Sequence, residues 1–178
     1  SNLGDAAVYC DFGKEINKEI NSNVIKYFYS IRNQKIKGIN NLTPSYNKLI
    51  ISFDLKLTNF NEIKKKIENL NINANIFQNN KKIKIPVCCE TIFSLDIEIL
   101  EKKLLLKRDK ILENFFNKEY FCYMTGFIAG MPFLGDLNKN MHTKRLETPR
   151  VRVPKGSVGI TEQFANIYTF ESPGGWNI

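Results

Sequence analysis

Residues 120–176 decide the fold, and they read YFCYMTGFIAGMPFLGDL at 120–137, TPRVRVPKGSVGI at 148–160 and IYTFESPGGW at 167–176. Seven of the chain's ten glycines and four of its six prolines lie in this range. Glycine allows backbone angles that other residues avoid, and proline fixes φ and removes a hydrogen-bond donor. Short β-branched and aromatic runs separate these residues, so the pattern predicts short strands joined by tight turns.

The N-terminal half has a different pattern. Apolar residues at three- and four-residue spacing predict helices over residues 16–31 and 60–70, the second capped by Asn59 with Glu62. Short apolar runs predict four strands, at residues 6–12, 39–46, 48–54 and 83–89. The resulting order, β-α-β-β-α-β, is that of a ferredoxin-like α+β domain with both helices on one face of the sheet. We therefore expect a first domain over residues 3–89.

The region between the two patterns is predicted to be helical. Residues 92–116 carry regularly spaced leucines, isoleucines and phenylalanines, and Lys107-Arg108-Asp109 is predicted to mark a break between two helices. This region is expected to bridge the first domain to the β-rich segment, so that residues 90–178 form a second domain.

The composition limits the classes of function. The net charge is +8 over 178 residues, but the lysines are scattered and the chain is rich in lysine, asparagine and isoleucine, which favours compositional drift over nucleic-acid binding. No apolar run reaches the length of a membrane span, and no secretory signal pattern is present. The sequence predicts a cytoplasmic protein that does not bind membranes, and a basic nucleic-acid binder is the least favoured of the alternatives.

Cysteine and histidine usage argues against a metal site. The four cysteines include no Cys-x-x-Cys and lie in apolar runs, so we expect buried free thiols. His142 is the only histidine and lies in a polar, basic segment, where a solvated loop residue is expected. The prediction is that the chain holds no metal through these residues.

The strongest candidates for catalytic residues are Arg150 and Arg152. Positions two apart in a strand point to the same face, and arginine is rare here, with five arginines against twenty-one lysines. A guanidinium group binds planar anions in a bidentate manner, so the pair suits a small carboxylate, carbamate or phosphate. The alternatives are a solvent-exposed pair or a pair that bridges acidic groups of the fold itself.

Other candidates would shape a substrate site. The backbone amides of Gly156, Ser157 and Gly159 could face an anion, although a tight hairpin turn explains the same residues. Five further residues are candidates for substrate contact, with loop or core packing as the alternative for each: Phe127, Gly130, Tyr168, Gly174 and Gly175.

Three blocks together resemble one family. They are Gly126-Phe127-x-x-Gly130-x-x-Phe133-Leu134-Gly135, Thr148-Pro149-Arg150-x-Arg152-Val153-Pro154-x-Gly156-Ser157-Val158-Gly159-Ile160 and Ser172-Pro173-Gly174-Gly175-Trp176. In this order they resemble allophanate hydrolase subunit 1, a family also described as the B subunit of 5-oxoprolinase and as sporulation kinase inhibitors. The resemblance implies a cyclophilin-like β-barrel after the ferredoxin-like domain. Family members continue beyond the third block, so this barrel is expected to be incomplete at its C-terminus or to close differently.

The resemblance also implies a function. One branch of the family belongs to ATP-dependent 5-oxoprolinase, which opens the lactam of 5-oxoproline to glutamate, with ATP and magnesium as cofactors. Its partners would be a homologous second subunit, similar to allophanate hydrolase subunit 2, and a third, hydrolytic subunit. A second branch forms the carboxyltransferase part of urea carboxylase systems, with a biotin carrier. In a third branch the domain is a non-catalytic inhibitor of a histidine kinase.

The sequence departs from the family pattern at several points. Ala129 and Met131 stand where the family has proline and phenylalanine, and residues 162–166 replace a glycine-rich turn. The altered turn favours the non-catalytic interaction module somewhat. The resemblance implies the 5-oxoprolinase subunit, in which Arg150 and Arg152 would supply the cations at the developing negative charge.

Overall fold

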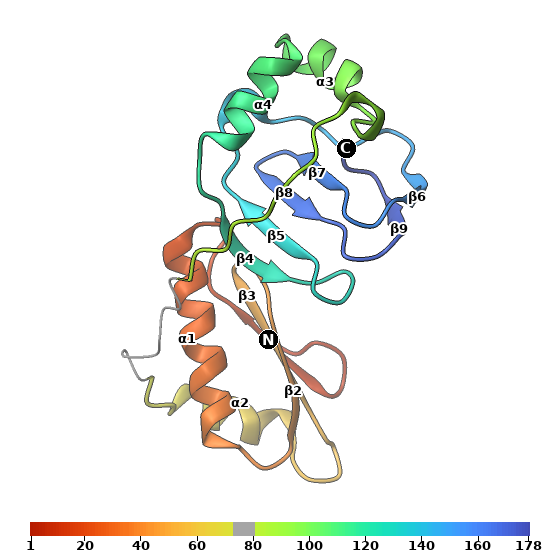
Figure 1. Ribbon diagram of the computed structural model, residues 1–178. Coiled ribbons are helices and arrows are strands. Elements are labelled where there is room, and N and C mark those ends of the chain that lie inside the picture. Colours follow the sequence, from red (N-terminus) through yellow and green to blue (C-terminus); the bar gives the residue numbers. More distant parts are fainter. Residues whose placement is uncertain (73–80) are drawn as a thin grey trace. The chain divides into compact units, whose positions relative to one another are not determined.

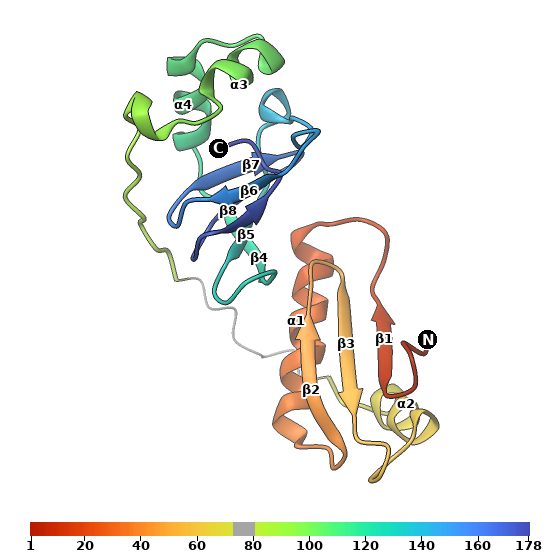
Figure 2. The same cartoon turned by 90° about the vertical axis from the view of Figure 1, so that its right-hand side faces the viewer.

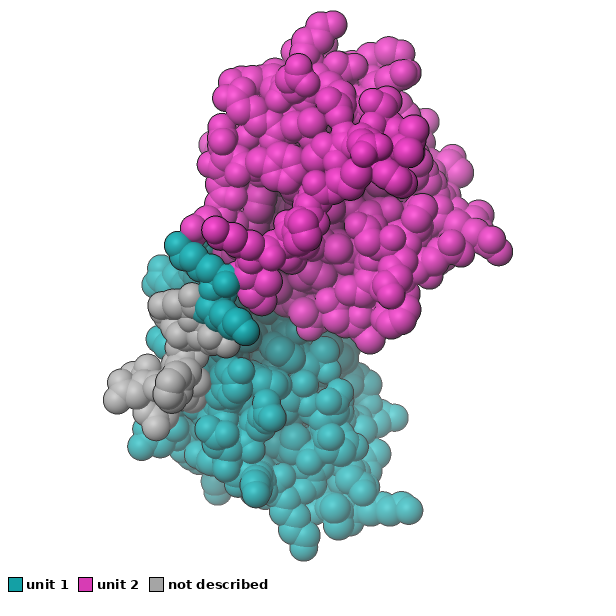
Figure 3. All heavy atoms as spheres, in the orientation of Figure 1, with its two compact units in different colours: residues 1–82 teal, residues 83–178 magenta. Residues whose placement is uncertain are grey.

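The computed structural model describes residues 1–72 and 81–178. The chain divides into two compact units, Ser1–Lys82 and Ile83–Ile178, which are coloured separately in Figure 3. The division falls seven residues before the predicted domain boundary after residue 89. Each unit has its own core and is described by itself.

The described part of unit 1 contains β1 (Ala7–Asp11), α1 (Lys18–Gln34), β2 (Ile39–Pro44), β3 (Lys48–Phe53) and α2 (Phe60–Glu68). The strands form an antiparallel sheet in the order β1-β3-β2. Alternate residues of β3 are buried, as expected for a strand with one covered face. The buried side chains of β3 pack with residues of both helices, so α1 and α2 cover the same face of the sheet (Figure 1). The buried core of unit 1 consists of Val8, Val24, Ile31, Leu49, Ile51, Phe53 and Ile63.

The predicted fourth strand is not formed. Residues 83–89 have no regular secondary structure and belong to unit 2. Ile83, Ile85 and Val87 recur at every second position as in a strand, but their side chains are exposed and Pro86 has no N–H to donate. The segment is instead held by the guanidinium group of Arg108, which donates to the carbonyl of Cys89. The α+β class is confirmed, whereas the four-stranded ferredoxin-like sheet is not.

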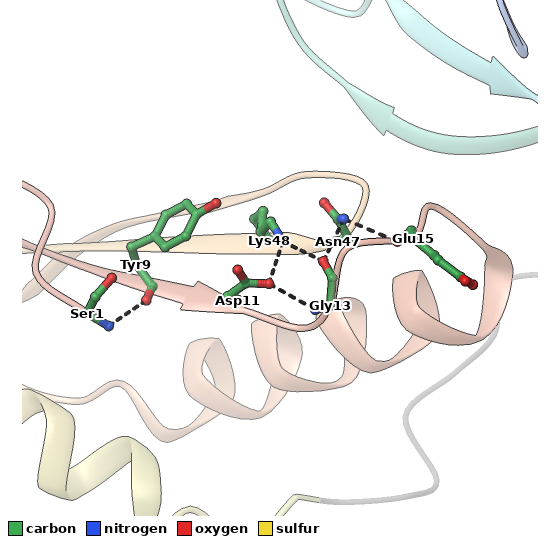
Figure 4. Close-up of polar contacts among 7 residues, drawn as sticks. All are labelled: Ser1, Tyr9, Asp11, Gly13, Glu15, Asn47 and Lys48. Atoms are coloured by element: carbon green, nitrogen blue, oxygen red, sulfur yellow. Dashed lines mark hydrogen bonds and ion pairs between the residues drawn. The ribbon is translucent and has the colours of Figure 1, made fainter.

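A polar cluster fixes the connection between β1 and α1 (Figure 4). Asn47 Nδ2 donates to the carbonyls of Gly13 and Glu15 at 2.9 and 3.1 Å. The Lys48 ammonium group contacts the Asp11 carboxylate, and this hydrogen bond and the one from the Gly13 N–H hold the pKa of Asp11 below its usual value. Because each of these charged groups already has a partner, the cluster stabilises the loop and offers no site.

Asn59 caps the N-terminus of α2, and this cap should stabilise the folded chain. Asn59 Oδ1 accepts from the Glu62 N–H at 3.1 Å, and Asn59 Nδ2 donates to Glu62 Oε1 at 3.0 Å. Asn59→Ala removes both bonds, and we expect a loss of about 1 kcal/mol in the free energy of unfolding, measured by urea denaturation. Asn33→Ala, on an exposed position of α1, is the control and should not destabilise the chain. Equal effects of the two substitutions would contradict the capping role.

Unit 2 begins with helical segments, η1 (Thr91–Phe93), α3 (Ile97–Leu104) and α4 (Arg108–Phe116). Leu105 adopts a left-handed conformation with φ of 54° and ends α3, so the predicted helix break is confirmed two to three residues from its expected position. Figure 1 shows the two α-helices side by side, and their apolar residues Leu100 and Ile111 pack in one cluster with Ile160 and Ala165 of the sheet.

The β-rich part of unit 2 forms two sheets from its described residues. Four strands, β4 (Phe121–Thr125), β5 (Pro132–Gly135), β7 (Val158–Thr161) and β8 (Phe164–Ile167), pair in the order β4-β5-β8-β7. A short helical turn, η2 (Lys139–Met141), follows β5, and β6 (Arg150–Val153) pairs with β9 (Ser172–Gly174). Figure 2 shows the strands of both sheets on one side of the helices. The expected short strands and tight turns are confirmed, while a closed cyclophilin-like barrel stays a prediction.

Candidate functional site

Tyr168 lies at the centre of the three sequence blocks. It follows β8, its side chain is buried, and it packs with Met131 and Val153. A Cβ atom at Gly174 would lie only 2.1 Å from the Tyr168 hydroxyl oxygen, so the β9 backbone can approach the ring only at a glycine. Burial raises the pKa of Tyr168, and this rise is opposed by the Asn166 side chain and by the charges of Arg145 and Arg150.

Arg150 lies beside this contact, because it is the partner of Gly174 in the β6–β9 pair. Its Nη1 donates to Asp96 Oδ2 at 2.8 Å, and its Nη2 contacts Asp96 Oδ1. Asp96 is 0% exposed and also accepts from the N–H of Ile178 at 2.7 Å. The guanidinium group of Arg150 is therefore paired with an acid of the fold, as in the second alternative, and a substrate role for Arg150 stays a prediction.

Arg152 has different surroundings. Its side chain is 80% exposed, and its Nε lies 3.6 Å from Oε1 of the exposed Glu171. A register irregularity between Arg150 and Val153 interrupts the regular strand pattern on which the shared face was predicted. The two arginines therefore do not form a matched pair, and a substrate role for Arg152 stays a prediction.

The turn before β7 does not present its amides to a ligand. The Gly156 N–H donates to the Tyr168 carbonyl at 2.7 Å, and the Ser157 N–H donates to the Pro154 carbonyl at 3.2 Å. Gly156 has a φ of +87°, which explains the glycine. Gly159 lies within β7, opposite Asn166. The alternative of a tight hairpin turn is thus confirmed for Gly156 and Ser157.

The loop between β4 and β5 contains the other two predicted contact residues. Phe127 has a φ of 67°, which is uncommon for a bulky residue, and its ring is largely exposed. Gly130 has a φ of 73°, and the loop is tied to the residue after Tyr168 by the Thr169 hydroxyl, which donates to the Ala129 carbonyl at 2.7 Å. The loop therefore borders the Tyr168 region, while Phe127 itself points to solvent.

Sequence reasoning missed Arg145, which lies against Trp176. The guanidinium carbon is 5.8 Å from the centre of the indole ring. The next residue, Leu146, donates its N–H to the Gly175 carbonyl at 2.7 Å and so fixes the segment to the third block. The scarcity of arginine that singled out Arg150 applies equally to Arg145, and that signal could have identified it.

A separate cavity of about 500 Å³ lies in unit 2 between the helices, β7 and residues 85–95. Gly156 and Ser157 contribute to its wall, but most of the lining is apolar, as in Ile92, Phe93 and Ile160. The shape and chemistry suit an apolar group rather than a small anion.

The cysteines differ from their predicted environment. Cys88 and Cys122 are exposed, Cys10 and Cys89 are half-buried, and all four are free thiols. The apolar runs that predicted burial contain an exposed connection at Cys88 and Cys89, and Cys122 lies on β4, at the edge of its sheet. Over residues 1–72 and 81–178, no group of three or more potential ligands could hold a metal ion, and His142 is exposed as expected.

One protein family matches the sequence over its whole length. The sequence model of the family described as "Carboxyltransferase domain, subdomain C and D" covers residues 1–178. The chain belongs to this family. Within it, the chain is 31% identical over 188 residues to the 5-oxoprolinase B subunit of Bacillus subtilis, and the match covers 99% of the chain and 78% of that relative. It is 35% identical over 145 residues to the 5-oxoprolinase B subunit of Haemophilus influenzae, with 80% and 64% covered.

A solved structure supports the fold of this carboxyltransferase-family chain. The crystal structure of TTHA0988 superposes with a TM-score of 0.84 at 23% identity, over 97% of this chain and 34% of the other. The chain thus spans about a third of that protein. In this chain the second sequence block (residues 148–160) and the third (residues 172–176) are neighbours, because Arg150 pairs with Gly174. The Tyr168 side chain lies against the same glycine. Within the described residues, no helix is long and apolar enough to cross a membrane.

Proposed function

We propose that this chain is a subunit of a 5-oxoprolinase, an enzyme that opens the lactam of 5-oxoproline to give glutamate in an ATP-dependent reaction. The observation that carries the proposal is the 31% identity to the 5-oxoprolinase B subunit of Bacillus subtilis, which extends over 99% of the chain. Two further relatives bear the same name, at 35% and 34% identity. We place the enzyme in the cytoplasm.

The chemistry of unit 2 supports a subunit rather than a complete enzyme. Opening a lactam needs cationic or N–H groups at the amide oxygen, where negative charge develops, and a base that activates water. The described residues of unit 2 offer two exposed arginine side chains, Arg145 and Arg152, and the single histidine of the chain, His142, lies exposed in a loop. We therefore assign substrate binding to this chain and the hydrolytic step to a partner subunit.

Among the described residues, the groups predicted to face an anion do not fit the phosphates of ATP. A triphosphate is usually held by free backbone amides and a lysine or arginine, yet the amides of Gly156 and Ser157 are engaged and Arg150 is paired with Asp96. The described residues also contain no group of three or more histidine, cysteine or acidic side chains that could hold a metal ion. We derive no phosphoryl step on this chain and place that step in the assembled enzyme.

An apolar surface on unit 2 supports a partner subunit. Ile83, Ile85, Ile92, Phe93 and Leu95 form the exposed apolar strip along residues 83–95, and Ile92 is 74% exposed. Large exposed apolar patches mark interaction sites more often than free surface. We propose that this strip contacts the homologous second subunit.

Phe93→Glu tests the apolar strip. We expect the substitution to weaken assembly with the second subunit at least tenfold, because a charge would be buried in an apolar contact, and to leave the urea midpoint of the isolated chain unchanged. Assembly is measured by calorimetric titration with the partner. Leu105→Glu is the control, since Leu105 is 89% exposed but does not line the cavity beside the strip. Unchanged affinity of the Phe93 variant would remove the strip from the interface.

The proposed activity is tested by reconstitution. The chain is mixed with the second subunit and the hydrolytic subunit, and ATP- and 5-oxoproline-dependent release of glutamate is measured, with Arg152→Lys as the variant that tests bidentate binding. A folded complex without turnover would favour the kinase-inhibitor type of interaction module. Carboxylation of a urea-like substrate by carboxybiotin would favour the carboxyltransferase, which the family description supports. No observation singles out a place for biotin, so no step is derived through it.

A further inference from the structure

We propose that the cavity of unit 2 binds a small amphipathic molecule, with an apolar body inside the cavity and an anionic group at its rim. The cavity measures about 500 Å³ and is lined by residues of the helices, β7 and the segment 85–95. This volume falls within the range of pockets that hold small ligands. The inference goes beyond the proposed function, which assigns no ligand to this cavity.

The floor of the cavity belongs to the packed core of unit 2. Leu100 of α3, Ile111 of α4, Met141 of η2 and Ile160 of β7 line the cavity, and each is at most 5% exposed. The same four side chains pack in one buried cluster, so close packing on all other sides holds them in place. The floor is therefore an apolar surface that exists before a ligand arrives.

Hydrogen bonds hold parts of the wall. The guanidinium group of Arg108 donates to the carbonyl of Cys89, and the Ser157 N–H donates to the Pro154 carbonyl at 3.2 Å. Cys89, Pro154 and Ser157 all line the cavity. The segment that carries Cys89 has no regular secondary structure, so the bond from Arg108 fixes a wall that strand pairing does not support.

The volume favours a small molecule over a docked helix. One turn of an α-helix with its side chains is about 10–12 Å across and about 5.4 Å high, which corresponds to about 400–600 Å³. The cavity would therefore hold about one turn, whereas a helix that docks in a groove uses anchors spread over about two turns. A molecule with a short alkyl chain fits within this volume.

Lys155 provides the charge at this cavity. It is the only charged side chain among the described lining residues, and it is exposed, which places its ammonium group at the rim. Its Nζ lies 5.7 Å from the centre of the exposed Phe170 ring and forms no ion pair with a carboxylate of the described residues. An ammonium group attracts an anion as a point charge, and the anion stays in water while the apolar body is buried.

Straight-chain carboxylates test the apolar part of the site in the full chain. Calorimetric titration with hexanoate, heptanoate and octanoate should show an affinity that rises about fourfold with each methylene group, since burial of a methylene contributes about 0.8 kcal/mol. Ser157→Phe adds a ring at a lining residue and should weaken octanoate binding about tenfold, with the urea midpoint as the check that the variant folds. An affinity independent of chain length, octanoate binding unchanged by Ser157→Phe, or no binding by the wild type would overturn the inference.

Lys155→Met tests the charge, because it removes the ammonium group and keeps an apolar stem. We expect about threefold weaker binding of octanoate, the size of an exposed ion pair, and unchanged binding of 1-octanol, which carries no charge. Lys139→Met is the matched control, since Lys139 is an exposed lysine of unit 2 that does not line the cavity. Equal effects of the two lysine variants, or equal losses for octanoate and 1-octanol, would reject the anionic group.

The two variants also separate this inference from the proposed subunit contact. Lys155 and Ser157 lie outside the exposed apolar strip along residues 83–95, so their substitutions change the cavity and leave the strip intact. Loss of octanoate binding with unchanged affinity for the second subunit would support the cavity as a ligand site of its own. Loss of assembly with unchanged octanoate binding would overturn it.

Discussion

Arg150→Met is expected to lower the free energy of unfolding of unit 2 by about 3–5 kcal/mol, the cost of removing one partner from a buried ion pair. The reason is that Asp96 is 0% exposed, and of the partners described for its carboxylate it would keep only the N–H of Ile178. Urea unfolding followed by Trp176 fluorescence reports unit 2 directly, because the chain has no other tryptophan.

Two variants control this prediction. Arg152→Met removes an arginine of the same strand that is 80% exposed and 3.6 Å from Glu171, and we expect a change within about 0.5 kcal/mol. The double variant Asp96→Asn/Arg150→Met should recover part of the lost stability, since it removes the uncompensated carboxylate. If Arg150→Met unfolds at the same urea concentration as the wild type, the ion pair does not stabilise unit 2 and Arg150 becomes available again as a substrate ligand.

Arg150 also shows where sequence reasoning stops. The scarcity of arginine correctly indicated that bidentate recognition occurs at this residue, but its partner Asp96 lies 54 residues earlier, beside a helix. Pairing at that separation depends on how α3 and β6 come together, which no local pattern encodes. The same argument, applied to Arg145, would have needed the position of Trp176, 31 residues further along.

Local patterns predicted the elements that local interactions stabilise. The helix α1, the strand β3 and the Asn59 cap agree with the sequence, because apolar spacing and capping bonds involve neighbouring residues. The strand expected at residues 83–89 failed for the opposite reason: a strand needs a partner, and this segment has none among the described residues. Its apolar residues remain exposed, which is the basis for the proposed contact with a second subunit.

Gly174→Ala is the second substitution with a large expected effect. The added Cβ would lie 2.1 Å from the hydroxyl oxygen of Tyr168 and 2.8 Å from its Cζ, and Tyr168 is fully buried. A buried ring cannot move aside without disturbing Met131 and Val153, so we expect unit 2 to lose about 3 kcal/mol, at the upper end of the usual cost of overpacking. The measurement is again urea unfolding followed at Trp176.

The neighbouring glycine separates this effect from the general cost of replacing glycine. A Cβ at Gly175 would meet only Pro149, at 3.5 Å, which is an ordinary contact, so Gly175→Ala should change stability by less than about 1 kcal/mol. Tyr168→Phe removes the oxygen that makes the closest contact, and the pair Gly174→Ala/Tyr168→Phe should therefore be more stable than Gly174→Ala alone. Additive effects of the two substitutions would show that the ring is not held against Gly174. Because Arg150 pairs with Gly174 in the same ribbon, that outcome would also weaken the view that the second and third blocks meet at Tyr168 to build the substrate site.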